Sequence, residues 1–230
     1  MTDLAAAAAS VGAPLTPQGV ARIETLLRRV REESEVQNLT AILEPGDMIV
    51  DHVQDSLALA GVAALAGRPL DAGPLCVDIG TGAGFPGIPL AIAFPASRWI
   101  LLESEGRKVQ WLEGIVAELG LANAEVAACR GRELRHARAD AEGRVGVVTA
   151  RAVGDLGKIA REARGLLEPG GVLLCPKGRN LEPAEVALGE REARKSHYEP
   201  GGVLDLDVPD RARVCVVYRR PTGSGNGGAR

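Results

Sequence analysis

LCVDIGTGAGFPGIPL, residues 75–90, is the part of this chain most informative about its fold. Its first five residues form a short run of mostly apolar residues, which predicts a buried strand over residues 75–79. Glycines follow at once, and a helix is expected over residues 87–94. A buried strand, a glycine-rich turn and a helix in this order are typical of the ligand-binding start of a doubly wound α/β sheet.

Downstream of this stretch, short apolar runs alternate with longer amphipathic segments. Such alternation predicts a parallel sheet covered by helices on both faces, and therefore the α/β class. The further strands are expected at residues 99–103, 124–128, 145–149, 172–175 and 214–218, and the further helices at residues 107–119, 155–167 and 184–195. The pattern Glu168-Pro169-Gly170-Gly171 is expected to end the helix over 155–167.

Four segments are expected along the 230 residues. Residues 1–16 are rich in alanine and are predicted to be a flexible N-terminus, and residues 221–230 to be a flexible glycine-rich tail. Residues 17–66 are predicted to form a helical extension, in which Thr16-Pro17 begins the first helix and a second runs over 47–65. Residues 67–220 are left as the α/β domain.

Composition limits the kinds of partner and compartment. A net charge of −3 argues against broad, sequence-independent attraction to nucleic acid, although Arg130 to Arg138 could form a local basic patch. The four cysteines include no C-x-x-C pair, so free thiols are expected rather than a metal site. With no targeting signal and no apolar run of membrane-spanning length, we expect a cytoplasmic protein without a membrane partner. The sequence does not give the oligomeric state.

The glycine turn has two possible ligands. Gly82-x-Gly84-x-x-Gly87 formally matches the dinucleotide fingerprint, so an NAD-dependent oxidoreductase is one alternative. Asp78, however, comes just before Gly80, where a carboxylate can hold the cationic amino-acid end of a sulfonium cofactor such as S-adenosylmethionine. Pro86 also removes an N–H group that a pyrophosphate would use. These details favour S-adenosylmethionine.

Glu103 ends the next expected strand. A carboxylate at that place can accept hydrogen bonds from both ribose hydroxyls of an adenosine cofactor. This is true of either nucleotide, so Glu103 supports a cofactor site without separating the two alternatives.

The whole motif resembles a specific family. VDIGTGAGFPGIPL is similar to the signature of bacterial small-subunit (16S) rRNA guanine-N7 methyltransferases, also called glucose-inhibited division protein B. Further similarities follow in the family's order: Asn38-Leu39-Thr40, His52-x-x-Asp55-Ser56-Leu57, Leu101-Leu102-Glu103-Ser104, Ala150-Arg151-Ala152 and Lys177-Gly178. The resemblance implies a methyltransferase-type Rossmann fold with a mostly parallel seven-stranded sheet whose last strand is antiparallel. It also implies methyl transfer from S-adenosylmethionine to N7 of one guanosine in small-subunit rRNA, free or in a partly assembled subunit.

The resemblance also assigns residues. It places Gly80, Phe85, Gly131 and Arg132 at the cofactor, and Arg151 at the mouth of the site near cofactor and RNA. The residues themselves add Asp78, Gly82, Gly84 and Glu103 as cofactor contacts at the turn and strand ends. Arg130, Arg151 and Lys177 are the expected RNA contacts, and Arg151 is the expected positioning residue.

One departure from the family concerns the loop after the third expected strand. The family usually has Arg-x-acid there, and this chain has Arg130-Gly131-Arg132-Glu133. Either Glu133 takes the role of the family's acid through a shifted loop, or the adenine of the cofactor is bound by backbone groups alone.

No acid–base residue is assigned as catalytic. Guanine N7 carries a free lone pair, so its methylation requires positioning rather than proton removal. His52-x-x-Asp55-Ser56 is expected to brace the extension against the pocket. Besides the oxidoreductase, the remaining alternatives are an inactive ribosome-associated module and a methyltransferase with another substrate.

Overall fold

The computed structural model describes residues 3–223 and contains one seven-stranded sheet in the order β3-β2-β1-β4-β5-β7-β6. Its strands are β1 (Leu75–Ile79), β2 (Arg98–Glu103), β3 (Ala124–Ala128), β4 (Val145–Thr149), β5 (Leu167–Gly178), β6 (Glu199–Leu206) and β7 (Arg213–Arg219). The first five strands pair in parallel, whereas β7 is antiparallel to both β5 and β6. The expected α/β fold with an antiparallel last strand is therefore confirmed. Most of the predicted tail, residues 224–230, lies outside the described residues.

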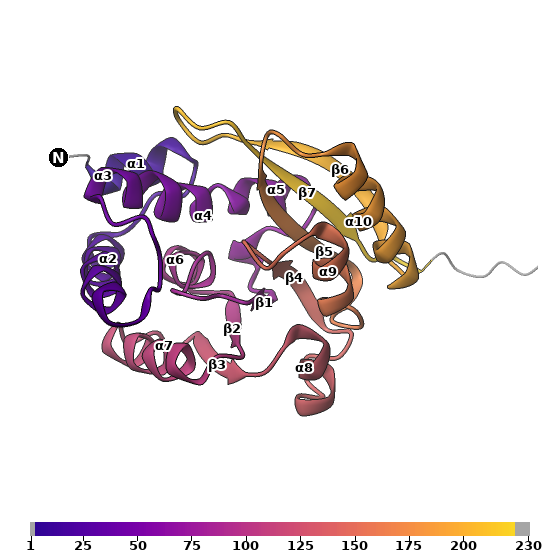
Figure 1. The fold of residues 1–230 in the computed structure, drawn as a ribbon, viewed down its shortest axis with the longest axis horizontal. Coiled ribbons are helices and arrows are strands. Elements are labelled where there is room, and N and C mark those ends of the chain that lie inside the picture. The colour runs from indigo at the N-terminus through magenta and orange to yellow at the C-terminus, as the bar shows by residue number, and fades with distance from the viewer. Residues whose placement is uncertain (1–2, 224–230) are drawn as a thin grey trace, which may run out of the picture.

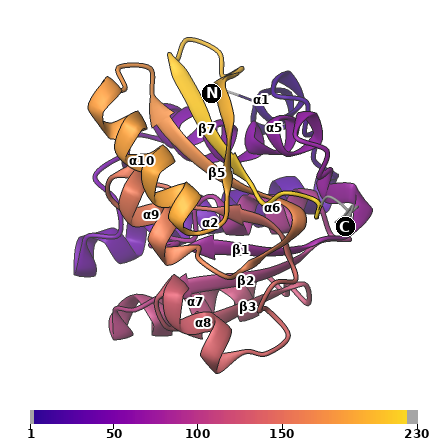
Figure 2. The ribbon, with the colours of Figure 1, turned by 90° about the vertical axis from the view of Figure 1, so that its right-hand side faces the viewer.

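Helices cover both faces of the sheet, as Figures 1 and 2 show. Side chains alternate between the faces along each strand. In β1, Cys76 packs into one core and Val77 into the other, and in β5 Leu174 and Leu173 divide in the same way. The first face carries the N-terminal helices with α6 (Gly87–Ala93) and α7 (Gly106–Glu118), and the second carries α8 (Gly131–Ala137), α9 (Leu156–Glu162) and α10 (Pro183–Lys195).

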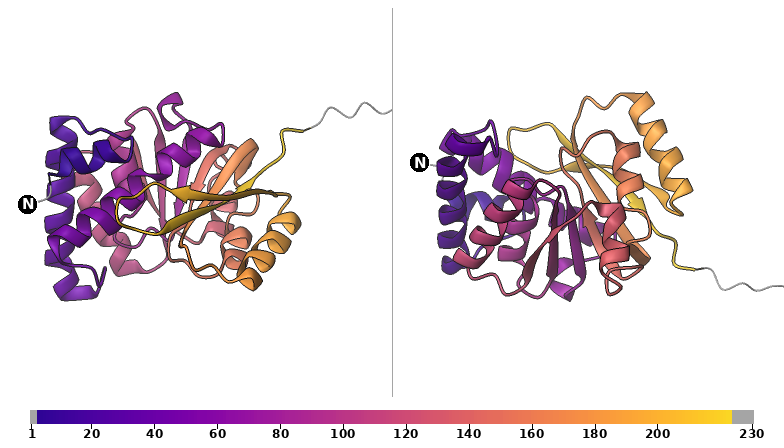
Figure 3. Two further views of the ribbon diagram at one scale, coloured as in Figure 1. Left: turned by 90° about the horizontal axis from the view of Figure 1, so that it is seen from above. Right: turned by 60° about the horizontal axis from the view of Figure 1, so that its bottom comes forward.

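The N-terminal extension packs beside α6 and α7 at one end of the molecule (Figure 3). Its longest helix, α2 (Pro17–Gln37), begins as predicted, because the Thr16 hydroxyl accepts a hydrogen bond of 3.1 Å from Gly19 N. It ends at Asn38, which takes a left-handed conformation with φ of 45°.

The predicted second helix is present but is not uniform. It consists of α3 (Pro45–Met48), a π-helical segment η1 (Ile49–Gln54), α4 (Asp55–Leu57) and α5 (Leu59–Leu65), and a short 3₁₀ turn η2 (Leu70–Ala72) follows. By length and composition the run Pro45–Leu65 could cross a membrane, but 67% of its most apolar window is buried inside the fold. Its apolar character is explained by packing against α6 and β5.

The alanine-rich start differs from the prediction of a flexible segment. Residues 4–10 form helix α1, and Leu4 and Ala8 are buried. Asp3 caps the helix by accepting from Ala5 N at 2.9 Å, and Gln54 Nε2 donates to Ala7 O at 3.0 Å. Alanine has the highest helix propensity, and the surface that holds this helix comes from residues about 50 positions later, which the local sequence does not reveal.

Three further elements correct the sequence analysis. The helix expected over 155–167 ends at Glu162, and the predicted stop Glu168–Gly171 lies inside β5, where the register with β4 shifts. Strand β6 was missed because Pro200, Gly201 and Gly202 look like a turn; they form a bulge on an edge strand. Helix α8 was missed because its sequence is charged and carries little apolar periodicity.

Candidate functional site

The main cavity measures about 760 Å³ and opens at the carboxyl ends of the parallel strands. One wall comes from the N-terminal extension, through Leu39, Thr40, Ile42, Asp51, His52 and Asp55. The other wall comes from the sheet and its loops, through Gly80–Ala83, Phe85, Glu103, Lys108, Arg151–Val153, Lys158, Pro176–Gly178 and Arg213. The extension is therefore part of the site and does more than support it.

The glycine turn forms an open stretch of backbone on the floor of this cavity. Gly80 and Gly82 have φ of +64° and +58°, values that side-chain-bearing residues rarely adopt. A Cβ at Gly80 would also lie 2.9 Å from a methyl of Val153. Gly84, predicted at the cofactor, faces Ile88 of α6 instead and does not line the cavity.

Asp78 also differs from the expectation. It is fully buried and does not line the cavity. Its carboxylate accepts a hydrogen bond of 2.9 Å from Gly87 N at the start of α6 and one of 2.8 Å from the Thr149 hydroxyl on β4. Burial raises the pKa of Asp78 to about 6, against these hydrogen bonds, which lower it. Asp78 thus ties the turn to the start of α6 and to β4, and it does not line the cavity.

Three planar groups meet between the extension and the sheet. The His52 ring stacks on the Phe85 ring at a centroid distance of 4.5 Å and an angle of 17°. The Arg151 guanidinium lies 5.5 Å from the centroid of the same Phe85 ring, within cation–π range. The resemblance named Phe85 and Arg151, and the structure brings both together with His52 at the cavity.

Hydrogen bonds continue this contact from Arg151 into the extension. Arg151 Nη1 donates to Asp51 O at 2.7 Å, and Arg151 Nη2 lies 3.3 Å from His52 Nδ1. Arginine can only donate, so Nδ1 accepts and the ring proton is on Nε2, which lies 3.0 Å from the Thr40 hydroxyl. Burial, with a further effect from the nearby Arg151 charge, lowers the pKa of His52 to about 4. His52 is therefore neutral near pH 7.

The π-helical segment sets where these groups lie. Asp55 N donates to Val50 O, five residues back, and the extra residue in this turn distinguishes it from an α-helix. The segment presents both the Asp51 carbonyl and the His52 ring toward Arg151. Segments of this kind are frequent at functional sites, and no pattern in the sequence marked this one.

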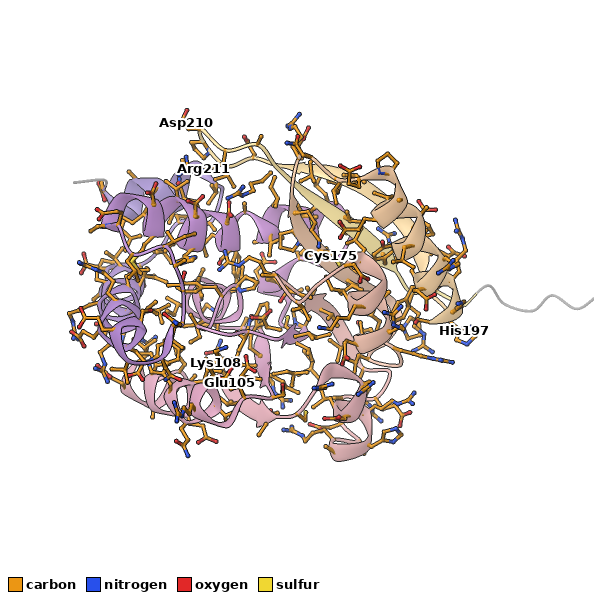
Figure 4. All side chains as sticks on the ribbon, in the orientation of Figure 1. Glu105, Lys108, Cys175, His197, Asp210 and Arg211 are labelled. Atoms are coloured by element: carbon orange, nitrogen blue, oxygen red, sulfur yellow. The ribbon has the colours of Figure 1, made fainter. Side chains whose placement is uncertain are left out.

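Two arginines bind the acidic side of the same helix. Arg213 donates to Asp55 Oδ2 and to Asp51 Oδ1, both at 3.0 Å, and Arg211 Nε donates to Asp51 Oδ1 at 2.7 Å. Figure 4 shows Arg211 and Asp210 beside the extension, in the loop between β6 and β7. These contacts, with the stack on Phe85, act as the brace that the His52–Ser56 motif predicted. Arg211 and Arg213, just before and at the start of β7, are thus the partners of the acidic residues of this helix.

Lysines surround the cavity mouth. Lys177, an expected RNA contact, is only 19% exposed at its side chain, and its ammonium bonds Glu185 at 2.9 Å and Gly154 O at 2.8 Å. Lys108 pairs with Glu105 at 2.7 Å on α7, and Figure 4 shows the two side by side. Lys158, which the sequence analysis missed, is exposed and lines the cavity.

A smaller cavity of about 180 Å³ adjoins the main one. Gly80, Glu103, Val153 and Lys158 line both, and the smaller cavity is completed by Ile79, Leu102, Ser104, Cys129, Arg130, Gly131 and Glu162. Glu103 ends β2, as predicted, and lies between the two pockets, with Oε1 accepting from Ser104 N at 2.7 Å. Arg132 is exposed and lines neither cavity, contrary to its expected place at the cofactor.

Comparison with known proteins agrees with this geometry. The family model described as GidB, rRNA small subunit methyltransferase G, matches residues 20–211. This chain belongs to that family. The resemblance seen in the sequence is confirmed, and membership of a methyltransferase family removes the oxidoreductase alternative.

Individual members of the family align over most of the chain. The ribosomal RNA small subunit methyltransferase G of Stenotrophomonas maltophilia strain K279a is 45% identical over 154 residues, covering 66% of each protein. The protein of that name from Leptothrix cholodnii is 31% identical over 95% of this chain and 94% of its own length. Among solved structures, Aeropyrum pernix fibrillarin with bound S-adenosyl-L-methionine is 21% identical, with a TM-score of 0.54 over 72% of this chain and 76% of fibrillarin. The last similarity concerns the fold alone.

Proposed function

We propose that this protein transfers the methyl group of S-adenosylmethionine to N7 of a guanosine in 16S rRNA, in the cytoplasm. The observation that carries the proposal is the family match over residues 20–211, which spans both walls of the main cavity. Two relatives that align with this chain bear the name ribosomal RNA small subunit methyltransferase G.

The cavities fit an adenosyl cofactor. Together they offer a glycine backbone at Gly80 and Gly82, whose positive φ values disfavour side chains, and a carboxylate, Glu103, at the junction of a large and a small pocket. Volumes of this order are usual for small-molecule sites. In this proposal, Gly80 and Gly82 pass under the cofactor, Glu103 holds its ribose hydroxyls, and Gly131 borders its adenine.

The methyl transfer requires little from the protein beyond positioning of the cofactor and the guanine. The cofactor supplies a methyl group on a positively charged sulfur, and guanine N7 supplies a lone pair that needs no deprotonation. Among the described residues at the cavity, His52 is neutral near pH 7 and its Nδ1 is occupied by Arg151. We therefore assign no general base. Phe85 and Arg151 would hold guanine and cofactor in line, which is the main source of rate in such a reaction.

The rim of the cavity suits an RNA partner. The overall charge is −3, and three of the four cations that line this cavity, Lys108, Lys177 and Arg213, are already paired with carboxylates. The exposed Lys158, which has no ion pair among the described residues, is therefore the cation at this rim most available to a phosphate backbone. Exposed Arg130 borders the smaller cavity. Because aromatic residues make up only 3% of the chain, a structured RNA or partly assembled subunit is a better substrate than a free single strand.

The test is methyl transfer from labelled S-adenosylmethionine to 16S rRNA and to partly assembled small subunits that lack the modification. We expect label in 7-methylguanosine, and its loss in Arg151→Ala, with thermal unfolding as the check that the variant is folded. Label in another nucleoside would refute the N7 assignment. Cofactor binding without transfer to any of these substrates would refute the rRNA substrate and favour an inactive ribosome-associated module.

A further inference from the structure

The smaller cavity lacks the acidic residue that the family usually provides after the third strand. In this chain that position is Arg132, whose exposed side chain does not line the cavity. Glu133, the next acid along the chain, is committed elsewhere: its carboxylate accepts a hydrogen bond of 2.9 Å from Arg130 N and so caps helix α8. Neither Arg132 nor Glu133 therefore places a carboxylate in this pocket.

Another acid reaches the pocket from a different helix. Glu162, at the end of α9, lines the smaller cavity and is 8% exposed. Its Oε2 accepts a hydrogen bond of 3.2 Å from Arg132 N, so this side chain contacts the same loop position where the family's acid is expected. Among residues 3–223, Oε1 of Glu162 has no recorded hydrogen-bond or ion-pair partner, and it is therefore available to a ligand.

Gly131 is the residue that lets Glu162 come so close. A Cβ at Gly131 would lie 2.6 Å from the backbone oxygen of Glu162 and 3.0 Å from a side-chain carbon of Ile79. Any larger residue would push α9 away from the β3 loop. The glycine and the glutamate thus act as a pair, separated by about 30 positions in sequence and in contact in the fold.

We propose that Glu162 replaces the family's strand-3 acid and accepts a hydrogen bond from the exocyclic amine of the cofactor's adenine. This inference rests on the proposed function. Ile79, Leu102 and Val153 provide apolar lining in the same pocket as the Glu162 carboxylate, and such a lining suits a flat base. An acceptor fixed at the edge of a base distinguishes an amine from a carbonyl, because the carbonyl would leave two acceptors facing one another.

The test compares two ligands that differ at the exocyclic group and in the protonation of the adjacent ring nitrogen. S-adenosylhomocysteine carries the amine, and S-inosylhomocysteine carries a carbonyl in its place. Calorimetric dissociation constants are measured for both with the wild type, Glu162→Leu and Glu133→Leu. Glu133→Leu is the matched control, since it makes the same substitution at a nearby acid whose side chain does not line the pocket.

We expect the wild type and Glu133→Leu to prefer the adenine ligand by about tenfold or more, the effect of one hydrogen bond to a charged group. In Glu162→Leu that preference falls to about twofold or less. If Glu162 only supported the loop at Arg132, the variant would weaken both ligands equally and keep the preference, which would overturn the inference. A lost preference in Glu133→Leu with an unchanged one in Glu162→Leu would overturn it in favour of Glu133.

The same measurements distinguish failure of the Glu162 inference from failure of the proposed function. If the wild type prefers the adenine ligand but Glu162→Leu does so equally, only the assignment of Glu162 is refuted. If the wild type binds neither ligand, the cofactor claim fails, and the inference fails with it.

Discussion

His52 makes the contact between the extension and the sheet sensitive to pH. In the folded protein its Nδ1 accepts from Arg151, and its ring lies against Phe85 with only 5% of the residue exposed. Protonation would put a second positive charge beside Arg151 and remove this acceptor. We therefore expect acidification to destabilise the folded chain through His52.

The size of this effect follows from the pKa. Burial and the nearby Arg151 charge lower the pKa of His52 from 6.5 to about 4, so the unfolded chain binds the proton more readily than the folded one. The stability gained from a neutral His52 is complete above pH 6.5 and is lost as the pH falls toward 4. At about pH 5 the loss is about 2 kcal/mol relative to neutral pH.

Asp78 contributes to the pH dependence of folding stability with the opposite sign. Its pKa of about 6 lies above the ordinary value of 3.8, so the folded chain holds this proton more firmly. The stability from protonated Asp78 is present below pH 3.8 and is lost as the pH rises through about 6. The pH dependence of wild-type stability is expected to combine both groups, so a variant of one residue is needed to isolate His52.

The assay is urea unfolding of wild type and His52→Phe at neutral pH and at about pH 5. His52→Phe keeps a ring against Phe85 and is expected to be less stable at neutral pH, because Arg151 and Thr40 lose a partner. Its stability should fall less on acidification than that of the wild type, by about 2 kcal/mol. His197→Gln, at an exposed position far from the cavity (Figure 4), is the matched control for loss of one histidine. Parallel pH dependences of wild type and His52→Phe would refute this account.

Two other substitutions test how the site is held. Gly87→Ala would place a Cβ 2.3 Å from a methyl of Leu101 and should lower the unfolding free energy by about 1–3 kcal/mol, measured by urea unfolding. Gly61→Ala, with nothing within 4 Å, is its control and should be neutral or stabilising by up to about 1 kcal/mol; equal losses in both would contradict the packing argument. Arg213→Ala leaves Asp55 with less compensation for its burial and should cost about 1–3 kcal/mol, with faster amide hydrogen exchange over residues 47–57. Unchanged exchange in that segment would show that Arg213 does not hold the extension.

Much of the fold was predictable because its signals are local. Apolar runs of strand length mark β1 to β4 with errors of one residue or less, and the hydroxyl and proline of Thr16-Pro17 mark the start of α2. The edge strand β6 was not predictable in this way, because its glycines and Pro200 are turn-forming residues that only pairing with β7 makes extended.

The features of the site likewise fall into those that local sequence predicts and those that it does not. The family, the glycine turn and the carboxylate Glu103 can be recognised from the sequence alone, because they depend on residue types at fixed spacing along one segment. The three-dimensional packing was needed to show that Asp78 faces inward, that a π-helical turn brings His52 to Arg151, and that Glu162 rather than Arg132 lines the smaller cavity. Each of these depends on a contact between segments about 10 to 100 positions apart, and such contacts are selected by packing of the whole core rather than by local propensity.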